Sequence, residues 1–109
     1  MAMGKLTTHI LDTAAGKPAA GVRIRLYHAG KLVAETLSNA DGRCDAPLLV
    51  DPEAGEYEIV FFIGDYFQQR GVPSPFLGEV PVRFLIEAGA SYHVPLVCSP
   101  FAYSTYRGS

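Results

Sequence analysis

The stretch VRIRLYHAGKLVAETLS, residues 22–38, carries the pattern that decides the fold. Val22, Ile24 and Leu26 alternate with arginine and tyrosine, and this two-residue period is typical of a strand with one core face and one wetter face. A further strand pattern follows after the sequence His-Ala-Gly-Lys. Gly30 suits a tight turn there because glycine adopts a positive φ at little cost. The stretch therefore predicts two neighbouring strands joined by a short turn.

The same period recurs along the chain, with turn residues between the runs. SNADGR at 38–43 is a turn by composition, and the residues just after it leave room for only a short strand. The other predicted strands are KLTTHIL (5–11), EYEIVFFI (56–63), VPVRFLIE (80–87), SYHVPLVC (91–98) and FAYSTYR (101–107). Because strands this short need a second sheet to cover their apolar faces, we expect an all-β sandwich of two sheets with about eight strands.

Two local features modify this pattern. GDYFQQRG at 64–71 breaks the alternation and predicts a helix of about two turns, with Asp65 as its cap and Gly71 at its end. Pro81 and Pro95 lack the N–H that a β-ladder needs, so each favours an edge strand or a bulge. We expect the helix to be a short insertion in the sandwich.

Composition limits the class of protein. The 109 residues are 49% hydrophobic and 18% charged with a net charge of −2, which favours a single compact domain spanning residues 1–109. Nine Lys and Arg against eleven Asp and Glu leave no basic stripe, so a nucleic-acid partner is not expected. The first residues lack a signal-peptide core and no apolar run approaches the ~18 residues of a membrane span. We expect a cytoplasmic protein without a membrane partner.

Cys44 and Cys98 stand alone in the sequence. Neither belongs to a Cys-x-x-Cys pair or to a zinc-ligand pattern. We interpret both as reduced, small apolar residues, with a disulfide as the minor alternative.

Two histidines lie on the polar side of their predicted strands. Leu6 and Ile10 form the apolar set of the first strand, which places His9 on the opposite face with Thr7. By the same argument His93 projects away from the core. A lone strand histidine is more often structural or simply exposed, and imidazole also binds metals, but no thiol or carboxylate lies at ligand spacing from either.

Several separate stretches then add up to a resemblance. LTTHILDTAAGKPAAGV (6–22), NADGR (39–43), GDYF (64–67), YHVPLVC (92–98) and the terminal YSTYRGS (103–109) together resemble the 5-hydroxyisourate hydrolases, the transthyretin-related enzymes of purine catabolism. The resemblance runs from Leu6 to Ser109 without an evident large gap. It implies a transthyretin-like (prealbumin-like) sandwich with one short helix, assembled as a homotetramer that is a dimer of dimers.

The resemblance also implies a set of site residues in a channel between dimers. The catalytic set is His9, Arg43, His93 and Ser109, and the substrate-binding set is Arg43, Tyr106, Arg107 and Gly108. No metal and no cofactor are implied. The aromatic tail would then be held in place as a wall of the active site. An arginine that follows a turn, as Arg43 does, has the simpler alternative of solvating a strand end.

The implied reaction is the hydrolysis of 5-hydroxyisourate to 2-oxo-4-hydroxy-4-carboxy-5-ureidoimidazoline. His9 and His93 would divide the work of base and proton donor, Arg43 would polarise the purine-derived substrate, and Ser109 would orient a histidine or the water. The alternative is a non-catalytic, transthyretin-like carrier of a small aromatic ligand, which would not need these polar groups.

Overall fold

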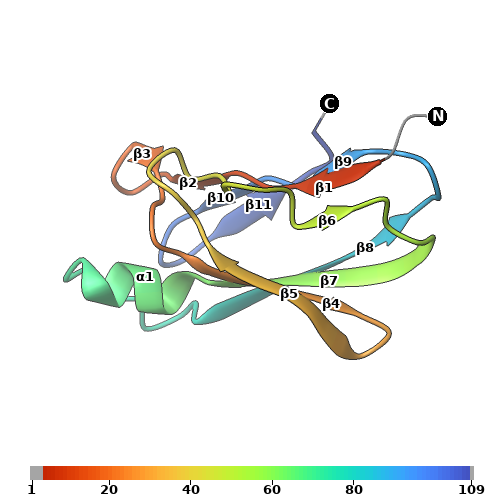
Figure 1. Cartoon of the computed structure of the whole chain (residues 1–109). Coiled ribbons are helices and arrows are strands. Elements are labelled where there is room, and N and C mark those ends of the chain that lie inside the picture. Colours follow the sequence, from red (N-terminus) through yellow and green to blue (C-terminus); the bar gives the residue numbers. More distant parts are fainter. Residues whose placement is uncertain (1–3, 109) are drawn as a thin grey trace.

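Two β-layers face each other in the computed structural model, which describes residues 4–108 (Figure 1). One layer is an antiparallel sheet in the order β5-β4-β7-β8. Its strands are β4 (Arg23–His28), β5 (Lys31–Leu37), β7 (Gly55–Phe62) and β8 (Glu79–Ile86).

Shorter strands build the second layer. They form two hydrogen-bonded groups in the orders β6-β1-β9 and β11-β10-β2-β3. The bounds are β1 (Lys5–Thr7), β2 (Ile10–Asp12), β3 (Lys17–Pro18), β6 (Leu49–Val50), β9 (Tyr92–His93), β10 (Leu96–Cys98) and β11 (Tyr103–Thr105).

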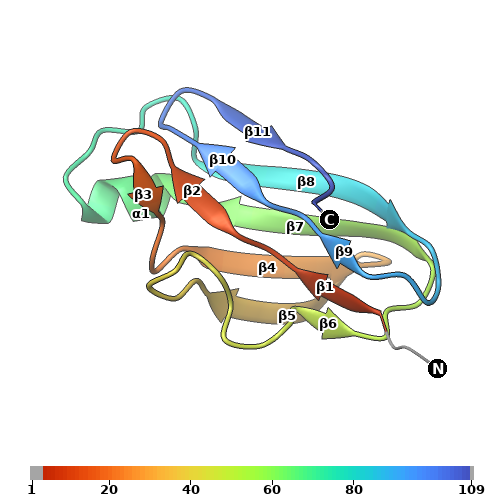
Figure 2. The same ribbon diagram turned by 90° about the horizontal axis from the view of Figure 1, so that it is seen from above.

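These two groups are one continuous layer. Leu6 pairs with Tyr92 and Ile10 pairs with Leu96, so the parallel register is the same before and after the interruption. The amides of Val94 and Leu96 donate to the carbonyls of Thr7 and His9 at 2.9 and 2.8 Å and carry the pairing across it. Segments β1–β2 and β9–β10 therefore run side by side through the middle of the layer (Figure 2). The predicted two-sheet sandwich is confirmed.

Apolar side chains from both layers fill the space between them. Ile24 and Leu26 of β4 are fully buried, as the alternation predicted. Each such aliphatic or aromatic side chain contributes about 1.5–3 kcal/mol to folding. The largest fully buried side chains are Tyr57, Phe61, Phe67, Leu6, Ile10, Ile24, Leu26, Ile59, Ile63 and Leu96.

The turn between β4 and β5 has two residues, Ala29 and Gly30, with φ of 52° and 76°. Positive φ at both central positions matches the right-handed twist of the flanking strands. Gly30 does what the sequence predicted, and Ala29 accepts a conformation that is uncommon for a residue with a Cβ atom.

The helix α1 (Ile63–Gln69) follows β7 directly, at the end of the sandwich (Figure 1). Tyr66 and Phe67 are buried and Gly71 has a φ of 73°, so the predicted helix and its end are confirmed. The predicted Asp65 cap is wrong: the N-cap position falls on Phe62, which makes no capping bond with its side chain. Because no loop separates strand from helix, Asp65 lies inside the first turn, where its charge still complements the helix dipole.

The two prolines differ in position. Pro81 lies in the edge strand β8, as predicted. Pro95 lies between β9 and β10 and not at an edge, because the β1–β2 segment is on one side of it and β11 is on the other. Alternate amides of a strand point to opposite sides. The amides of Val94 and Leu96 point to β1–β2, so the missing N–H of Pro95 falls on the β11 side, where Thr105 donates to its carbonyl at 2.8 Å.

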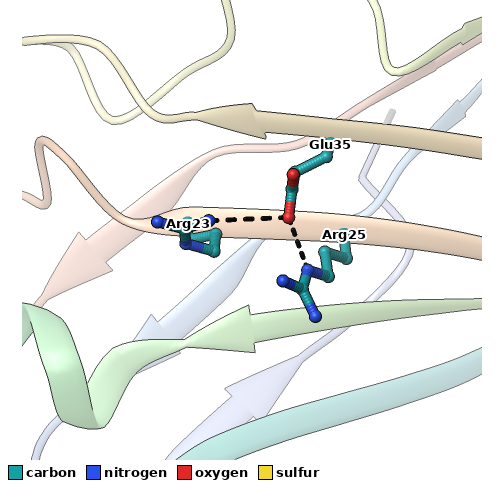
Figure 3. A network of polar contacts seen from close by, with 3 residues as sticks. All are labelled: Arg23, Arg25 and Glu35. Carbon is teal, nitrogen blue, oxygen red and sulfur yellow. Dashed lines mark hydrogen bonds and ion pairs between the residues drawn. The ribbon is translucent and has the colours of Figure 1, made fainter. Parts of the chain in front are cut away.

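The outer face of the β5-β4-β7-β8 layer carries several ion pairs. The carboxylate of Glu35 lies between the guanidinium groups of Arg23 and Arg25 (Figure 3). On the same sheet, Arg83 Nε is 2.7 Å from Glu58 Oε2. These exposed pairs contribute little stability. The candidate histidines His9 and His93 belong to the other layer.

Neither cysteine forms a disulfide within the described residues, in agreement with the sequence interpretation. Cys98 is buried, and burial together with the nearby Asp12 raises its pKa to about 12. Cys44 is half-buried, and burial again raises its pKa.

Candidate active site

His9 and His93 lie on the outer face of the second layer. His9 falls between β1 and β2, and His93 ends β9 directly opposite Thr7. Thr8 and Val94, which have the opposite parity, are buried, whereas both histidines are half-buried. The two imidazoles therefore share one face of adjacent strands, with their Cα atoms roughly 8 Å apart by strand geometry. The predicted orientation away from the core is confirmed.

Arg43 reaches the same face from a distant loop. It pairs with His9 in an isolated antiparallel bridge, and the amide of Ile10 donates to the carbonyl of Gly42 at 2.8 Å. Residues directly opposite in such a bridge project from the same face. The side chains of Arg43 and His9 are thus neighbours.

Asn39 shapes the loop that presents Arg43. Its Oδ1 accepts hydrogen bonds from the amides of Asp41 and Arg43 at 2.9 and 3.1 Å. The backbone N–H of Asn39 donates to the carbonyl of Arg43 at 2.7 Å. The composition of this stretch predicts a turn, but no role for Asn39 was predicted, although an asparagine at the start of a turn is the signal for an Asx turn.

Gly42 is required in this loop by space as well as conformation. Its φ is 74°, and a Cβ at this position would lie 2.4 Å from the carbonyl oxygen of Ile10. Only glycine lets the loop approach β2 this closely. The close approach places Arg43 beside His9.

The C-terminal tail returns to His93. Gly108 forms an isolated bridge with His93, and its amide donates to the histidine carbonyl at 2.7 Å. A Cβ on Gly108 would lie 2.6 Å from His93 Cδ2, so the backbone of the tail touches the imidazole ring. The predicted ordered tail is confirmed up to Gly108, and Ser109 lies outside the described residues.

Tyr106 and Arg107 contact other residues than Gly108 does. The guanidinium of Arg107 lies 4.2 Å over the ring of Tyr92, and its Nη2 donates to the carbonyl of Ser91 at 3.2 Å. Both residues border a cavity of about 240 Å³ that is also lined by Val82 and Phe84 of β8. The fold thus gathers His9, Arg43, His93 and Gly108, and it places Tyr106 and Arg107 at a neighbouring cavity in the single chain. Their role in substrate binding stays a prediction.

The surroundings of His93 favour its neutral form. Burial, then the positive charge of Arg43, then His9, lower the pKa of this imidazole below its usual value. The Oγ1 atom of Thr7 lies 2.9 Å from His93 Nδ1. A neutral imidazole with one nitrogen held in this way can accept or donate a proton at the other. Thr7 was not identified from the sequence as a site residue, although its shared parity with His9 was the available signal.

Two absences hold for residues 4–108. No three histidine, cysteine, aspartate or glutamate side chains lie together as a metal site would require. In the same part of the chain, no helix is long and apolar enough to cross a membrane.

Two facing sheets and a short helix after β7 define the class of prealbumin-like β-sandwich proteins. Residues 6–108 match the model of the HIUase/Transthyretin family, and the chain belongs to this family.

The relatives of the chain include enzymes and a hormone-binding protein. The 5-hydroxyisourate hydrolase of Mesorhizobium japonicum is 55% identical, over 97% of this chain and 93% of that protein. The solved structure of Klebsiella pneumoniae 5-hydroxyisourate hydrolase has a TM-score of 0.88 at 36% identity, over 97% of this chain and 99% of that one. Sea bream transthyretin in complex with thyroxine has a TM-score of 0.83 at 26% identity, covering 95% and 94% of the two chains. The predicted fold and family are confirmed, and the high identity to named hydrolases agrees with the predicted enzyme.

Proposed function

We propose that the protein hydrolyses 5-hydroxyisourate to 2-oxo-4-hydroxy-4-carboxy-5-ureidoimidazoline in urate degradation. The observation that carries this proposal is the meeting of His9, Arg43 and His93 on one outer face, although they come from three distant parts of the sequence. The names of the relatives supply the substrate.

The proposed reaction is the opening of a cyclic amide by water. One imidazole takes a proton from water as the oxygen adds to the lactam carbonyl carbon. The carbon–nitrogen bond then breaks, and the leaving nitrogen receives a proton from the other imidazole, which enters the step protonated and ends it neutral. His9 and His93 share these two roles. General acid–base catalysis of this kind typically contributes about 10² to 10⁴ in rate.

Arg43 stabilises the negative charge that grows on the substrate oxygen. A guanidinium group presents paired N–H donors in a fixed plane, which suits carbonyl and enolate oxygens. A donor aimed at developing charge is worth about 10² to 10³ in rate. The bridge to His9 keeps this group beside the base and the proton donor.

The end of the chain completes the proposed site. Gly108 touches His93, and Ser109 is the next residue in the sequence. We assign to Ser109 the orientation of a histidine or the water, through its hydroxyl. Deletion of the last four residues should abolish activity, and a fully active truncated protein would contradict this role.

A homotetramer in the cytoplasm is part of the proposal. β8 and β11 are edge strands, and both edges carry exposed apolar side chains, with Leu85 71% and Tyr103 46% exposed. Unpaired edges of this kind are suited to pairing with a second copy of the chain. Two dimers that stack over the face of His9 would enclose a channel. Analytical ultracentrifugation would measure the number of subunits, and a monomer would contradict the assembly.

The experiment that tests the function is the loss of freshly generated 5-hydroxyisourate, followed by absorbance without added metal. The wild-type protein should accelerate the spontaneous decay, and His9→Asn or His93→Asn should lower kcat at least about tenfold. His28→Asn is the matched control, because His28 lies elsewhere, stacked on Tyr57 at 4.1 Å. A folded His9→Asn protein with normal turnover would remove His9 from the mechanism.

The same assay separates the enzyme from a carrier. The transthyretin neighbour in complex with thyroxine makes a non-catalytic carrier the second candidate. A carrier would bind an aromatic ligand but would leave the decay rate of 5-hydroxyisourate unchanged.

A further inference from the structure

Thr7 makes a direct contact with the imidazole of His93. Its Oγ1 lies 2.9 Å from His93 Nδ1, and the two residues are paired directly opposite each other in the parallel register of β1 and β9. The contact joins residues that are 86 positions apart in the sequence. It follows from direct strand pairing in the middle of a layer.

The backbone around Thr7 limits how this hydroxyl can move. The amide of Val94 donates to the carbonyl of Thr7 at 2.9 Å, which fixes the strand on the His93 side. Threonine is branched at Cβ, so its χ1 angle has few accessible values. The next residue, Thr8, is buried and donates to the carbonyl of Val94 at 2.7 Å, which anchors the same segment from the core side.

We propose that Thr7 is a positioning residue for His93: its hydroxyl occupies Nδ1, so that Nε2 is the nitrogen that exchanges a proton with water or substrate. This inference rests on the proposed hydrolase function. A hydroxyl group can both donate and accept. It therefore keeps its bond to Nδ1 when His93 is neutral and when Nε2 has taken up a proton.

A hydroxyl partner suits this site better than a carboxylate. A carboxylate beside an imidazole stabilises the protonated ring and raises its pKa. Among residues 4–108, the charged and titratable groups that shift the pKa of His93 are Arg43 and His9, and both favour the neutral ring. Thr7 holds the ring without adding a charge, so the orientation of His93 and its protonation are controlled by different residues.

The test compares Thr7→Val, which removes the hydroxyl and keeps the shape, with Thr7→Ser, which keeps the hydroxyl. We expect Thr7→Val to lower kcat about 10- to 100-fold with a small change in KM, which is the range found for groups that orient metal-binding histidines. Thr7→Ser should recover most of the activity. Thr13→Val is the matched control, because the Thr13 hydroxyl donates at 3.0 Å to the carbonyl of Cys98, away from His93.

The spectroscopic readout is the set of ¹⁵N chemical shifts of the His93 ring in the intact protein. A single dominant tautomer in wild type and Thr7→Ser, and a mixture in Thr7→Val, would support the proposal. Thr7→Ala replaces Thr7→Val should valine prevent folding, as judged by circular dichroism. If the variant without the hydroxyl keeps both the wild-type ring shifts and the wild-type kcat, the proposed role of Thr7 is overturned. Failure of the wild-type protein to accelerate substrate loss would instead reject the proposed function, and the ring shifts would still decide whether Thr7 fixes the tautomer.

Discussion

Arg43 and His9 face each other across a single antiparallel bridge, and the adjacent amide of Ile10 donates to the carbonyl of Gly42. These contacts join the start of β2, and the residue just before it, to the loop that follows β5. A base candidate and an anion-binding group are thereby held at neighbouring positions by backbone pairing. Substitutions of Arg43 or His9 should therefore lower kcat strongly and change the stability of the fold little.

Arg43→Lys should lower kcat by about 10² to 10³, because an ammonium group keeps the charge but not the paired donors. The fold should remain intact, since Arg43 is exposed in the single chain. Arg23→Lys provides the control: Arg23 lies on the outer face of the other layer, beside Glu35. Steady-state kinetics on both variants make the comparison, and equal losses in the two proteins would argue against a role for Arg43 in the reaction.

The activity should persist below the usual titration range of histidine. Burial, Arg43 and His9 lower the pKa of His93, so the neutral ring needed for proton acceptance survives to lower pH. Arg43→Gln removes one of these causes and should move the acidic limb of the kcat profile to higher pH. A limb that stays in place in this variant would show that another group limits the rate.

Stability should depend on pH through the same ring. Because the folded protein disfavours protonated His93, the unfolded chain binds more protons between the lowered pKa and the ordinary value near 6.5. Stability therefore falls as the pH drops through this window and is recovered above it. His93→Gln should flatten this part of the curve in urea unfolding. A variant with the wild-type pH dependence would contradict the lowered pKa.

Gly108→Ala should push the His93 ring away from its position. The added methyl group would lie 2.6 Å from His93 Cδ2, closer than unbonded carbon atoms approach, so the ring or the tail must move. We expect at least a tenfold loss of kcat, about the effect of a 1.4 kcal/mol rise in the barrier, without loss of the fold. Gly78→Ala is the matched control, because a Cβ there meets no atom within 4 Å. Normal turnover in Gly108→Ala would mean that the tail does not position His93.

Tyr66→Phe should weaken the fold and leave the reaction unchanged. The Tyr66 hydroxyl donates to Asp12 Oδ2 at 2.8 Å, and Asp12 is a buried carboxylate that ties β2 to α1. Burial and this contact raise the pKa of Tyr66 to about 12. Loss of one partner of a buried charged group costs about 1–3 kcal/mol. Urea unfolding should detect this decrease, and a parallel loss of kcat would connect the helix to the site in a way that we do not expect.

Much of the fold follows from local patterns in the sequence. The alternation in KLTTHIL and SYHVPLVC places His9 and His93 opposite the core, because successive side chains of any strand point to opposite faces. The turn at Gly30 and the end of the helix at Gly71 follow from the conformational freedom of glycine. These features depend on neighbours in the sequence, so they can be predicted without the structure.

Only the tertiary structure decided which residues meet. The parallel register puts Thr7 opposite His93, the loop approach puts Arg43 beside His9, and the guanidinium of Arg107 stacks on Tyr92. The wrong cap at Asp65 and the interior position of Pro95 also depend on how elements join and pair. Local stereochemistry sets the face on which a side chain lies, whereas its partners depend on the packing of segments that are far apart in the chain.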